Sequence, residues 1–508
     1  MFFEDTICAP ATSVGNGAIN IIRLSGRNCF EILDKVVRFK KGTTADFKGY
    51  TVHFGTVLSR ENEGEVLDEV LVTVFRAPYS YTGEDSAEIS CHASPYITSN
   101  IIYRLIDVGA RSAEAGEFTK RAFINGKMDL AQAEAVADVI ASETASAHRV
   151  SMNQLKGGYS KELAGMRDEL LELTSLMELE LDFSEEEVEF ANRSRLKELL
   201  GKITGHINGL TDSFRVGNAV KNGVPVAIAG ATNAGKSTLL NSLLNEERAI
   251  VSDIPGTTRD TIEESMILGG YRFRFIDTAG IRESDETIEK IGIQRTFEEV
   301  RKADIILYVI DSSEPIEEEV GNYLEFRDKV DFKEQKLILL FNKCDKDGSD
   351  ANALAFRRKL EDVVRLEGES LRCNGEDAIS ISAKTVSVGY EEGEKCGFAI
   401  SSDVTDAISI SAMTGEGVED IKKRLIEIQS GREAGSYGTL VTNARHFEAL
   451  TKSGDLLRKV GESLDAGIPN DLIAQDLREA LHHLGTITGS ITTDEVLGRI
   501  FEKFCIGK

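Results

Sequence analysis

Paired cysteines are missing from this chain of 508 residues. Its seven cysteines are scattered, with no C-x-x-C pair and no histidine at the spacing of a zinc ligand. Disulfide frameworks and structural zinc sites both depend on such spacings, so the sequence argues against either kind of scaffold. Isolated cysteines are typical of a reducing compartment such as the cytosol.

Basic residues are also scarce. The chain has 59 Lys and Arg against 85 Asp and Glu, which gives a formal net charge of −26. Binding to nucleic acid by bulk electrostatics requires a basic surface that displaces counterions from phosphates. We therefore expect any contact with RNA to be local or to be supplied by a partner protein.

Long apolar runs and a basic leader are absent too. No stretch is apolar over a length that would cross a bilayer. The N-terminus, MFFEDTICAP, carries acids where a targeting peptide carries basic residues. The sequence therefore predicts a soluble, cytoplasmic protein with no membrane contact.

The most informative segment that is present spans residues 225–244. An apolar run predicts a buried strand, Gly230 to Ser237 match the pattern G-x-x-x-x-G-K-S/T, and an amphipathic helix follows. Gly230 and Gly235 let backbone N–H groups curl around an anion, and the helix N-terminus adds positive charge. We expect Lys236 to reach the β- and γ-phosphates of a nucleotide and Ser237 to bind Mg²⁺.

Three further motifs follow in the order that GTPases share. Thr258 is the candidate to complete the Mg²⁺ shell, Asp277 to support the metal, and the Gly280 N–H to bind the γ-phosphate. Asp345 can accept from N1–H and the 2-amino group of guanine, donors that adenine lacks, and so selects GTP. The motifs are Gly256-Thr257-Thr258-Arg259-Asp260, Asp277-Thr278-Ala279-Gly280 and Asn342-Lys343-Cys344-Asp345.

The glutamine that positions water in Ras-like GTPases is absent, because Ile281 follows Gly280. Acids in the next segment are candidate substitutes, although any one of them taken alone is more often a solvated helix face. The Asn233 amide oxygen either ligates a monovalent cation beside the phosphates, in the place of an arginine finger, or stabilises the turn. The acids are Glu283, Asp285, Glu286 and Glu289.

The flanking segments predict two more kinds of domain. Residues 1–118 alternate β-rich runs with turns, which indicates an α+β domain, with strands near 19–26, 50–59, 69–77 and 86–93 and a helix near 94–110. Helical periodicity begins after residue 118, with Asp129 as an expected N-cap, and resumes after the nucleotide-binding segment. Neither helical block makes a core alone, so we predict that they pack together around an inserted domain. The predicted ranges are 1–118, 119–216, 217–431 and 432–508.

The heptapeptide DAISISA occurs twice, at residues 377–383 and 406–412. Only one copy can occupy a given strand position. The second copy leads into a turn and a helix, so we expect it to form the strand and residues 384–405 to be a loop-like insertion. Ser411 and Ala412 are then expected beside the guanine, with Ser382-Ala383-Lys384 as the alternative.

Taken together, these motifs resemble the MnmE (TrmE) family of bacterial and organellar tRNA modification GTPases. The resemblance covers essentially the full length. Beyond the GTPase motifs it rests on the terminal Phe504-Cys505-Ile506-Gly507-Lys508 and on residues 22–26 (IRLSG), 81–85 (YTGED), 116–123 (GEFTKRAF) and 130–135 (LAQAEA).

The resemblance implies a multidomain fold: an N-terminal α+β domain that dimerises and binds a 5-formyl- or methylene-type tetrahydrofolate, a helical-bundle domain in two segments, and an inserted α/β Ras-like G domain. It implies a K⁺-dependent GTPase that forms a carboxymethylaminomethyl-type group at C5 of the wobble uridine of certain tRNAs. The implied partner is a flavin-dependent subunit of the MnmG (GidA) type, in a heterotetramer. Gly15-Asn16-Gly17 lacks the third glycine and helix of a dinucleotide fingerprint, which fits that division of labour.

The resemblance also implies roles for individual residues. Lys236, the water-positioning Glu289 and the terminal Cys505 are the expected catalytic residues. Ser237 and Thr258 match the Mg²⁺ ligands, and the expected K⁺ ligands are Asn233, Ser252, Ile254 and Thr257. The expected folate contacts are Arg23, Glu88, Lys127 and Lys508. Further expected GTP contacts are Ala234, Gly235, Thr238, Asp253, Pro255, Gly256, Thr278, Ala279, Asn342, Lys343, Cys344, Ser411, Ala412 and Met413.

Three positions depart from the family pattern: Thr232 replaces a proline, Ala93 a glycine, and Met413 a Lys or Arg. Two other functions are weighed against the resemblance. A regulatory switch GTPase without modification activity has no need of a folate pocket or of the terminal CIGK. A membrane-remodelling GTPase is disfavoured, since no basic amphipathic helix is present and the C-terminus is a poor prenylation signal.

Overall fold

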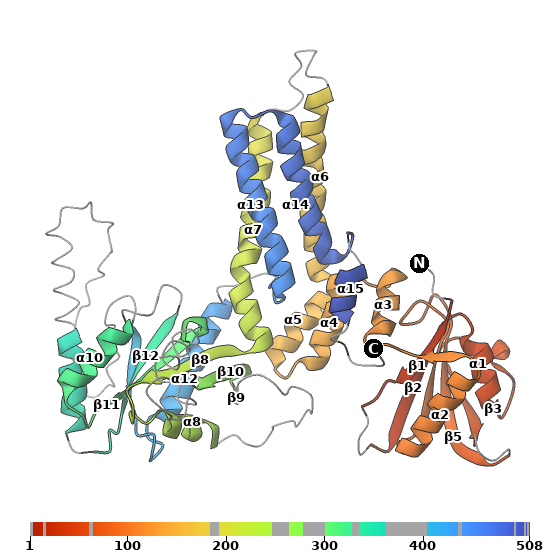
Figure 1. Cartoon of the computed structure of the whole chain (residues 1–508), viewed down its shortest axis with the longest axis horizontal. Helices are drawn as coiled ribbons and strands as arrows, with labels where there is room; N and C mark the ends of the chain where they lie inside the picture. Colours follow the sequence, from red (N-terminus) through yellow and green to blue (C-terminus); the bar gives the residue numbers. More distant parts are fainter. Residues whose placement is uncertain are drawn as a thin grey trace, which may run out of the picture. The chain divides into compact units, whose positions relative to one another are not determined.

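The computed structural model describes residues 4–13, 17–59, 64–182, 193–245, 264–277, 300–327, 335–346, 348–360, 404–434, 439–491 and 494–501, together with Phe504 and Gly507. The chain divides into two compact units (Figure 1). One comprises Met1–Glu143, Ala147–Phe214 and Asn443–Lys508, and the other Thr144–Ser146 and Arg215–Thr442. The second unit therefore interrupts the first along the chain. Among the described residues, no helix combines the length and apolarity needed to cross a membrane.

A seven-stranded sheet of order β3-β4-β5-β6-β2-β1-β7 forms the N-terminal part of the first unit. All neighbouring pairs are antiparallel except β1 and β7. The four strands and the helix predicted before residue 111 are confirmed, whereas β1, β3, β7 and α1 were not predicted because short elements carry little periodicity. The strands are β1 Thr6–Pro10, β2 Ile19–Ser25, β3 Val37–Phe39, β4 Thr51–Leu58, β5 Val66–Phe75, β6 Ser86–His92 and β7 Ala110–Ser112; the helices are α1 Cys29–Val36, η1 Thr44–Asp46 and α2 Pro95–Asp107.

The two faces of this sheet differ. Alternate side chains such as Val72 and Ile89 are fully buried in a core with α1 and α2. The opposite face leaves large apolar side chains in water: Val52 is 57% exposed, Phe54 42% and Leu71 50%. The strands of β4 and β5 thus alternate between a covered face and an open one.

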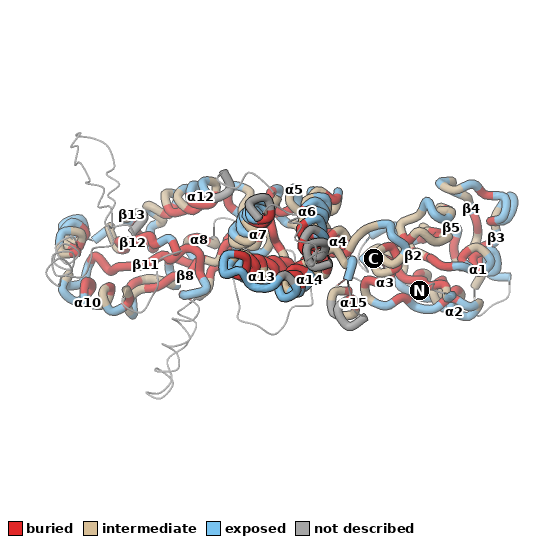
Figure 2. The backbone as a smooth tube through the Cα atoms, turned by 90° about the horizontal axis from the view of Figure 1, so that it is seen from above, coloured by how far each residue is buried: buried red, intermediate tan, exposed pale blue. Residues whose placement is uncertain are grey.

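A bundle of long helices completes the first unit (Figure 1). α13 packs on α14, and α14 packs on α6, so segments from both sides of the interruption share one core. Figure 2 shows buried backbone along the inner sides of these helices. The helices are α3 Glu117–Ile124, α4 Leu130–Ala141, α5 Ala145–Leu155, α6 Gly158–Asp182, α7 Arg193–Asn222, α13 Ala444–Ala466, α14 Asn470–Thr488 and α15 Asp494–Phe501.

Local signals explain where α4 begins and ends. Asp129 caps it as predicted: its side chain accepts from the Gln132 N–H at 2.8 Å, while the Gln132 side chain accepts from the Asp129 N–H at 3.1 Å. The helical pattern after residue 128 does not continue through residue 155. Ser142 donates back to the Val139 carbonyl oxygen at 2.7 Å and has an extended backbone, and this ends α4 before α5 begins.

The second unit is built on a six-stranded sheet of order β13-β12-β11-β8-β10-β9. Every neighbouring pair is parallel except β10 and β9. Buried cores lie on both faces, which explains why β11 is apolar over most of its length. The strands are β8 Val224–Gly230, β9 Glu264–Leu268, β10 Tyr271–Asp277, β11 Ile305–Asp311, β12 Lys336–Asn342 and β13 Val404–Ser409; the helices include α8 Lys236–Asn245, α10 Ile316–Arg327 and α12 Val418–Ala434.

Candidate nucleotide-binding site

The described parts of the predicted nucleotide motifs meet at one edge of the second sheet. Because β10, β8, β11, β12 and β13 run parallel, their carboxyl ends lie together. The P-loop follows β8, Asp277 ends β10, Asn342 ends β12, and Ser411 follows β13. Open parallel sheets bind ligands at this edge.

The P-loop between β8 and α8 contains three residues with positive φ. The angles are +144° at Gly230, +64° at Asn233 and +98° at Gly235. A Cβ at Gly230 would lie 2.2 Å from the Val309 carbonyl oxygen, and one at Gly235 would lie 2.2 Å from Asn342 Nδ2. Glycine is therefore required at both positions for packing as well as for conformation.

Lys236 begins α8 and folds back over this loop. Its Nζ donates to the carbonyl oxygens of Gly230 at 2.9 Å and Ala231 at 2.7 Å. Ser237 and Thr238, which follow it in α8, are exposed. A cation and exposed hydroxyls at a helix N-terminus fit a phosphate group, and a hydroxyl oxygen is a ligand type that suits Mg²⁺.

Asn342 joins the P-loop to the segment after β13, where the guanine contacts are expected. It is 2% exposed; its Nδ2 donates to the Ala234 carbonyl oxygen at 2.7 Å, and its Oδ1 accepts from the Ala412 N–H at 2.9 Å. The Cys344 N–H donates to the Ile410 carbonyl oxygen at 3.1 Å. These contacts bring the P-loop, the segment after β12 and the segment after β13 together.

Asp345 follows Cys344 in the segment after β12, and its side chain is exposed. A hydrogen bond to Ser411, which is fully buried, lowers the pKa of Asp345 below its ordinary value. An exposed, ionised carboxylate is what a bidentate acceptor for guanine requires. Met413 is 88% exposed and has no described polar contact.

The second DAISISA copy occupies the strand position. β13 runs parallel to β12, and a register shift occurs where Leu337 faces Val404 and Ile338 faces Asp406. The first copy, with the alternative Ser382-Ala383-Lys384, lies outside the described residues. The segment that pairs with β12 and contacts Asn342 is therefore the second copy, residues 406–412.

Other predicted site residues cannot be placed. The Asp277 backbone lies in β10 opposite Ile228, and nothing is described of its side chain. The residues outside the described structure are Ser252, Asp253, Ile254, Pro255, Gly256, Thr257, Thr258, Thr278, Ala279, Gly280, Glu283, Asp285, Glu286, Glu289, Cys505 and Lys508.

Sequence reasoning missed Asp311. This residue ends β11, is 4% exposed and forms an ion pair with Lys343, whose φ is +65°. Burial acts to raise the pKa of Asp311, but hydrogen bonds from Lys343 and Ser313 outweigh it and lower the pKa. The sequence signal that could have identified Asp311 is an acidic residue at the end of an apolar run, between the motifs that begin at Asp277 and Asn342.

Two of the predicted folate contacts meet on the N-terminal sheet. Arg23 of β2 lies opposite Glu88 of β6, and its Nε and Nη2 donate to Glu88 Oε1 at 3.0 and 2.8 Å. The guanidinium carbon lies 5.5 Å from the Tyr81 ring centroid and 5.7 Å from that of Phe118. Lys127 instead donates to the Pro78 carbonyl oxygen at 2.9 Å, and no described contact joins it to Arg23 or Glu88.

The C-terminal segment reaches the same place. Arg23 Nη1 donates to the Gly507 carbonyl oxygen at 3.1 Å. Gly507 has a φ of +98°, and a Cβ there would lie 2.1 Å from the Pro10 carbonyl oxygen. Gly116 likewise allows close packing, since a Cβ at this position would lie 2.9 Å from the Cβ atom of Phe504. The described part of the terminus is thus seated on the N-terminal domain.

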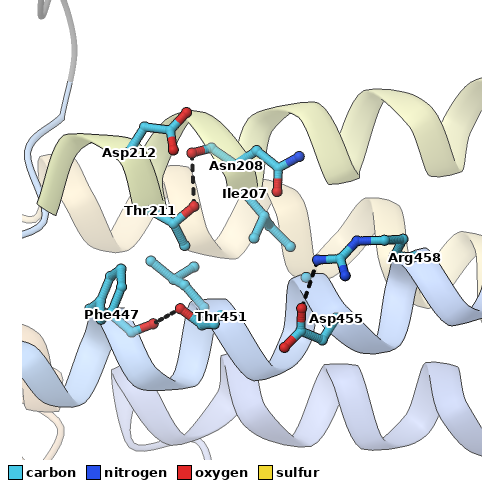
Figure 3. A pocket seen from close by; sticks show the side chains of 10 residues that line it. Ile207, Asn208, Thr211, Asp212, Phe447, Thr451, Asp455 and Arg458 are labelled. Carbon is cyan, nitrogen blue, oxygen red and sulfur yellow. Dashed lines mark hydrogen bonds and ion pairs between the residues drawn. The ribbon is translucent and has the colours of Figure 1, made fainter. Parts of the chain in front are cut away.

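A groove of about 230 Å³ lies between α7 and α13 of the bundle (Figure 3). Several of its polar side chains bond within their own helices: Arg458 pairs with Asp455 at 2.7 Å, and Thr451 donates to the Phe447 carbonyl oxygen at 2.8 Å. No predicted site residue lines it.

Comparison with known proteins bears on the whole chain. Residues 6–127 match the family described as GTP-binding protein TrmE N-terminus, and residues 130–505 match the MnmE helical domain. The tRNA modification GTPase MnmE of Christiangramia forsetii is 46% identical over 514 residues, which cover 100% of both chains. That of Bacteroides thetaiotaomicron is 46% identical over 509 residues, covering 99% of this chain and 100% of the relative.

Solved structures resemble this chain only in part. The crystal structure of Era in complex with MgGDPNP and nucleotides 1506–1542 of 16S ribosomal RNA is 20% identical, covering 46% of this chain and 66% of that chain with a TM-score of 0.27. A likeness of this degree carries no argument about function.

Proposed function

This chain belongs to the MnmE (TrmE) family of tRNA modification GTPases, with a P-loop GTPase domain, and we propose that it couples GTP hydrolysis to the addition of a carboxymethylaminomethyl-type group at C5 of the wobble uridine of certain tRNAs. The observation that carries the proposal is the junction at Asn342, which joins the P-loop to the two segments expected around guanine. Asp345 reads the base in this scheme, and Lys236 meets the β- and γ-phosphates.

Cations complete the proposed GTPase site. Mg²⁺, which the family's GTPase activity implies, neutralises charge on the β- and γ-phosphates when it is bound, with Ser237 and Thr258 as its protein ligands. For K⁺ we propose Asn233, Ser252, Ile254 and Thr257. The exposed, left-handed Asn233 is the one of these four that the structure describes, and its amide oxygen is a suitable ligand type.

Hydrolysis in this proposal does not use a glutamine after Gly280. Glu289 positions the attacking water, and Lys236 stabilises charge that develops on the phosphates. The residue type supports the role, because a carboxylate can accept a hydrogen bond from water.

The N-terminal domain is the proposed site for a tetrahydrofolate of the 5-formyl or methylene type. The Arg23–Glu88 pair, flanked by the Tyr81 and Phe118 rings, offers charged and aromatic contacts to such a ligand. Lys127 and Lys508 would contribute positive charge. The contact from Arg23 to Gly507 supports a role at this site for Cys505, which lies two residues before Gly507 in the sequence.

The proposed assembly is a homodimer through the N-terminal domain, joined by two copies of a flavin-dependent MnmG (GidA)-type subunit. The flavoprotein would supply redox chemistry, which this chain has no dinucleotide fingerprint to support. It would also supply basic surface for tRNA, which fits the net charge of −26 here.

The test is reconstitution of the full-length protein with its flavoprotein partner, GTP, Mg²⁺, K⁺, a tetrahydrofolate and tRNA. Nucleoside analysis should detect modified wobble uridine, and phosphate release should accompany it. The regulatory switch GTPase would be favoured instead if the reconstituted protein hydrolyses GTP without forming modified uridine and if a deletion strain still modifies its wobble uridine normally.

A further inference from the structure

Asp68 of β5 and His92 at the end of β6 form a hydrogen-bonded pair. His92 Nδ1 lies 2.7 Å from Asp68 Oδ1, and the His92 backbone N–H donates to Asp68 Oδ2 at 2.9 Å. The Glu69 N–H donates to Asp68 Oδ1 at 2.9 Å. Both carboxylate oxygens of Asp68 thus form hydrogen bonds, and His92 is held through its ring and through its backbone N–H.

The two side chains differ sharply in exposure. The side chain of Asp68 is 7% exposed, whereas that of His92 is 72% exposed. Because Asp68 accepts, Nδ1 carries the proton and Nε2 presents a lone pair. Within the part of the chain that the structure describes, no protein group hydrogen bonds to Nε2. A buried carboxylate that orients an exposed imidazole is an arrangement suited to proton transfer.

The His92 side chain alternates onto the same face as the Arg23–Glu88 pair, whereas Asp68 alternates along β5 onto the covered face, with the buried Val70 and Val72. Glu88, Ser90 and His92 alternate along β6 with the buried Ala87, Ile89 and Cys91, so they share the open face. The register places Arg23 opposite Glu88 and Ile19 opposite His92. Four residues of strand separate the two pairs, or roughly 13 Å.

The floor between the pairs is largely apolar. Leu71 of β5 lies opposite Ser90, and Ser90 lies opposite Ile21 of β2. Phe54 of β4 lies opposite Leu71 and adds a further apolar side chain to this floor. An elongated ligand with a flat ring system can lie on such a floor, with one end at Arg23 and the other at His92.

We propose that His92 is a catalytic acid–base residue for a ligand bound on the open face of the N-terminal sheet and that Asp68 is its positioning residue. The inference rests on the proposed function, because the ligand is the tetrahydrofolate proposed for the Arg23–Glu88 site. The step is a proton transfer: an N–H or O–H bond of the ligand breaks, its electron pair stays on the ligand atom, and Nε2 takes the proton. The imidazolium formed faces Asp68 and returns the proton to solvent.

The test compares His92→Gln, Asp68→Asn and the control His482→Gln, whose histidine is exposed on α14. Each full-length variant is assayed with the flavoprotein for modified uridine and for phosphate release. We expect His92→Gln to lower modification about 10²- to 10⁴-fold with GTP hydrolysis within twofold of wild type. Asp68→Asn should lower uridine modification less than His92→Gln does and should shift the pH profile of modification, which a purely structural contact would not do. His482→Gln should change neither modification nor GTP hydrolysis.

A labelling experiment separates this inference from the proposed function. Diethyl pyrocarbonate should modify His92 in the free protein, and 5-formyltetrahydrofolate should protect His92 but not His482. Formation of modified uridine within threefold of wild type by His92→Gln would overturn the inference while leaving the proposed function intact. If the wild type forms no modified uridine, the proposed function fails, and the labelling decides: protection of His92 by the folate supports the dyad, whereas no protection, or protection by an anticodon stem-loop alone, rejects it.

Discussion

Asn342 donates a hydrogen bond from Nδ2 to the carbonyl oxygen of Ala234 at 2.7 Å, across 108 residues of sequence. Ala234 belongs to the P-loop, and Asn342 ends β12. The other half of the same amide accepts from Ala412 at 2.9 Å. One buried side chain therefore joins the phosphate-binding loop to both segments expected around the base.

Replacing Asn342 with Ala should weaken nucleotide binding. The change leaves the Ala234 oxygen and the Ala412 N–H without this partner in a buried position, which costs about 1–3 kcal/mol. We expect GTP affinity to fall about 5- to 150-fold on that scale. Calorimetric titration with GTP measures this. Asn352→Ala is the matched control, because Asn352 donates at 2.9 Å to the Ser312 carbonyl oxygen without joining two nucleotide motifs. Equal losses in both variants would contradict the role of Asn342.

Asp345→Asn should shift nucleotide preference from GTP to XTP. Xanthine carries a carbonyl group where guanine carries the 2-amino donor, so the amide of Asn can donate to xanthine where the carboxylate only accepts. Competition binding with GTP and XTP measures the change, and Asp350→Asn, which alters an exposed acid nearby, is the control. Unchanged GTP affinity in Asp345→Asn would reject this residue as the reader of guanine.

K⁺ should stimulate hydrolysis much more than Na⁺. The chain lacks the usual glutamine, and a cation held by Asn233 would meet the charge that develops between the β- and γ-phosphates. Asn233→Gly is the sharpest variant because glycine keeps the φ of +64° and removes only the amide. Phosphate release in KCl and NaCl is the measurement. The hypothesis is wrong if the two salts give equal rates in wild type or if Asn233→Gly keeps the difference.

Deleting Cys505 to Lys508 should abolish tRNA modification and leave GTP hydrolysis nearly intact. The tail contacts Arg23 through Gly507 in the N-terminal domain, whereas the GTP motifs lie in the other compact unit. Gly507→Ala should also lower tRNA modification, because the alanine Cβ would clash with the Pro10 carbonyl oxygen.

The control for the tail is Gly498→Ala, since a Cβ at Gly498 in α15 has no atom within 4 Å. Modified uridine and phosphate release are measured for each variant with the partner present. Normal modification by the truncated protein would rule out a terminal site, and parallel loss of both activities would indicate misfolding.

The contact between α4 and α13 should weaken at low pH. Burial acts to raise the pKa of Glu134, but His446 at 2.7 Å and the two contacts from Arg445 at 3.0 Å outweigh it and hold the pKa at about 2. A lowered carboxyl pKa contributes stability that is fully present above the unfolded value of 4.5 and is lost as the pH falls toward 2.

Hydrogen exchange of α4 and α13 between pH 5 and 2 measures this loss, because a local readout suits a chain with two compact units. Glu134→Gln should abolish the pH dependence that belongs to this contact. Glu448→Gln removes an exposed acid on α13 and should leave it unchanged. Protection of α4 that stays constant down to pH 2 in the wild type would contradict the assignment.

Local patterns account for what the sequence alone determined. The P-loop, the guanine motif and the Asp129 cap each depend on residues within a few positions of one another, so spacing and residue type were sufficient to predict them. Four of the seven strands of the N-terminal sheet were predicted in the same way, from β-rich runs between turns.

Tertiary structure decided the contacts between distant residues. The turn and helix after the second DAISISA copy correctly indicated that this copy forms the strand, but its contact with Asn342 depends on pairing with β12. The ion pair of Asp311 with Lys343, the pair of Asp68 with His92, and the seat of Gly507 beside Arg23 depend on which strands become neighbours. Strand neighbours are set by burying apolar faces over the whole domain, and no local spacing encodes that outcome.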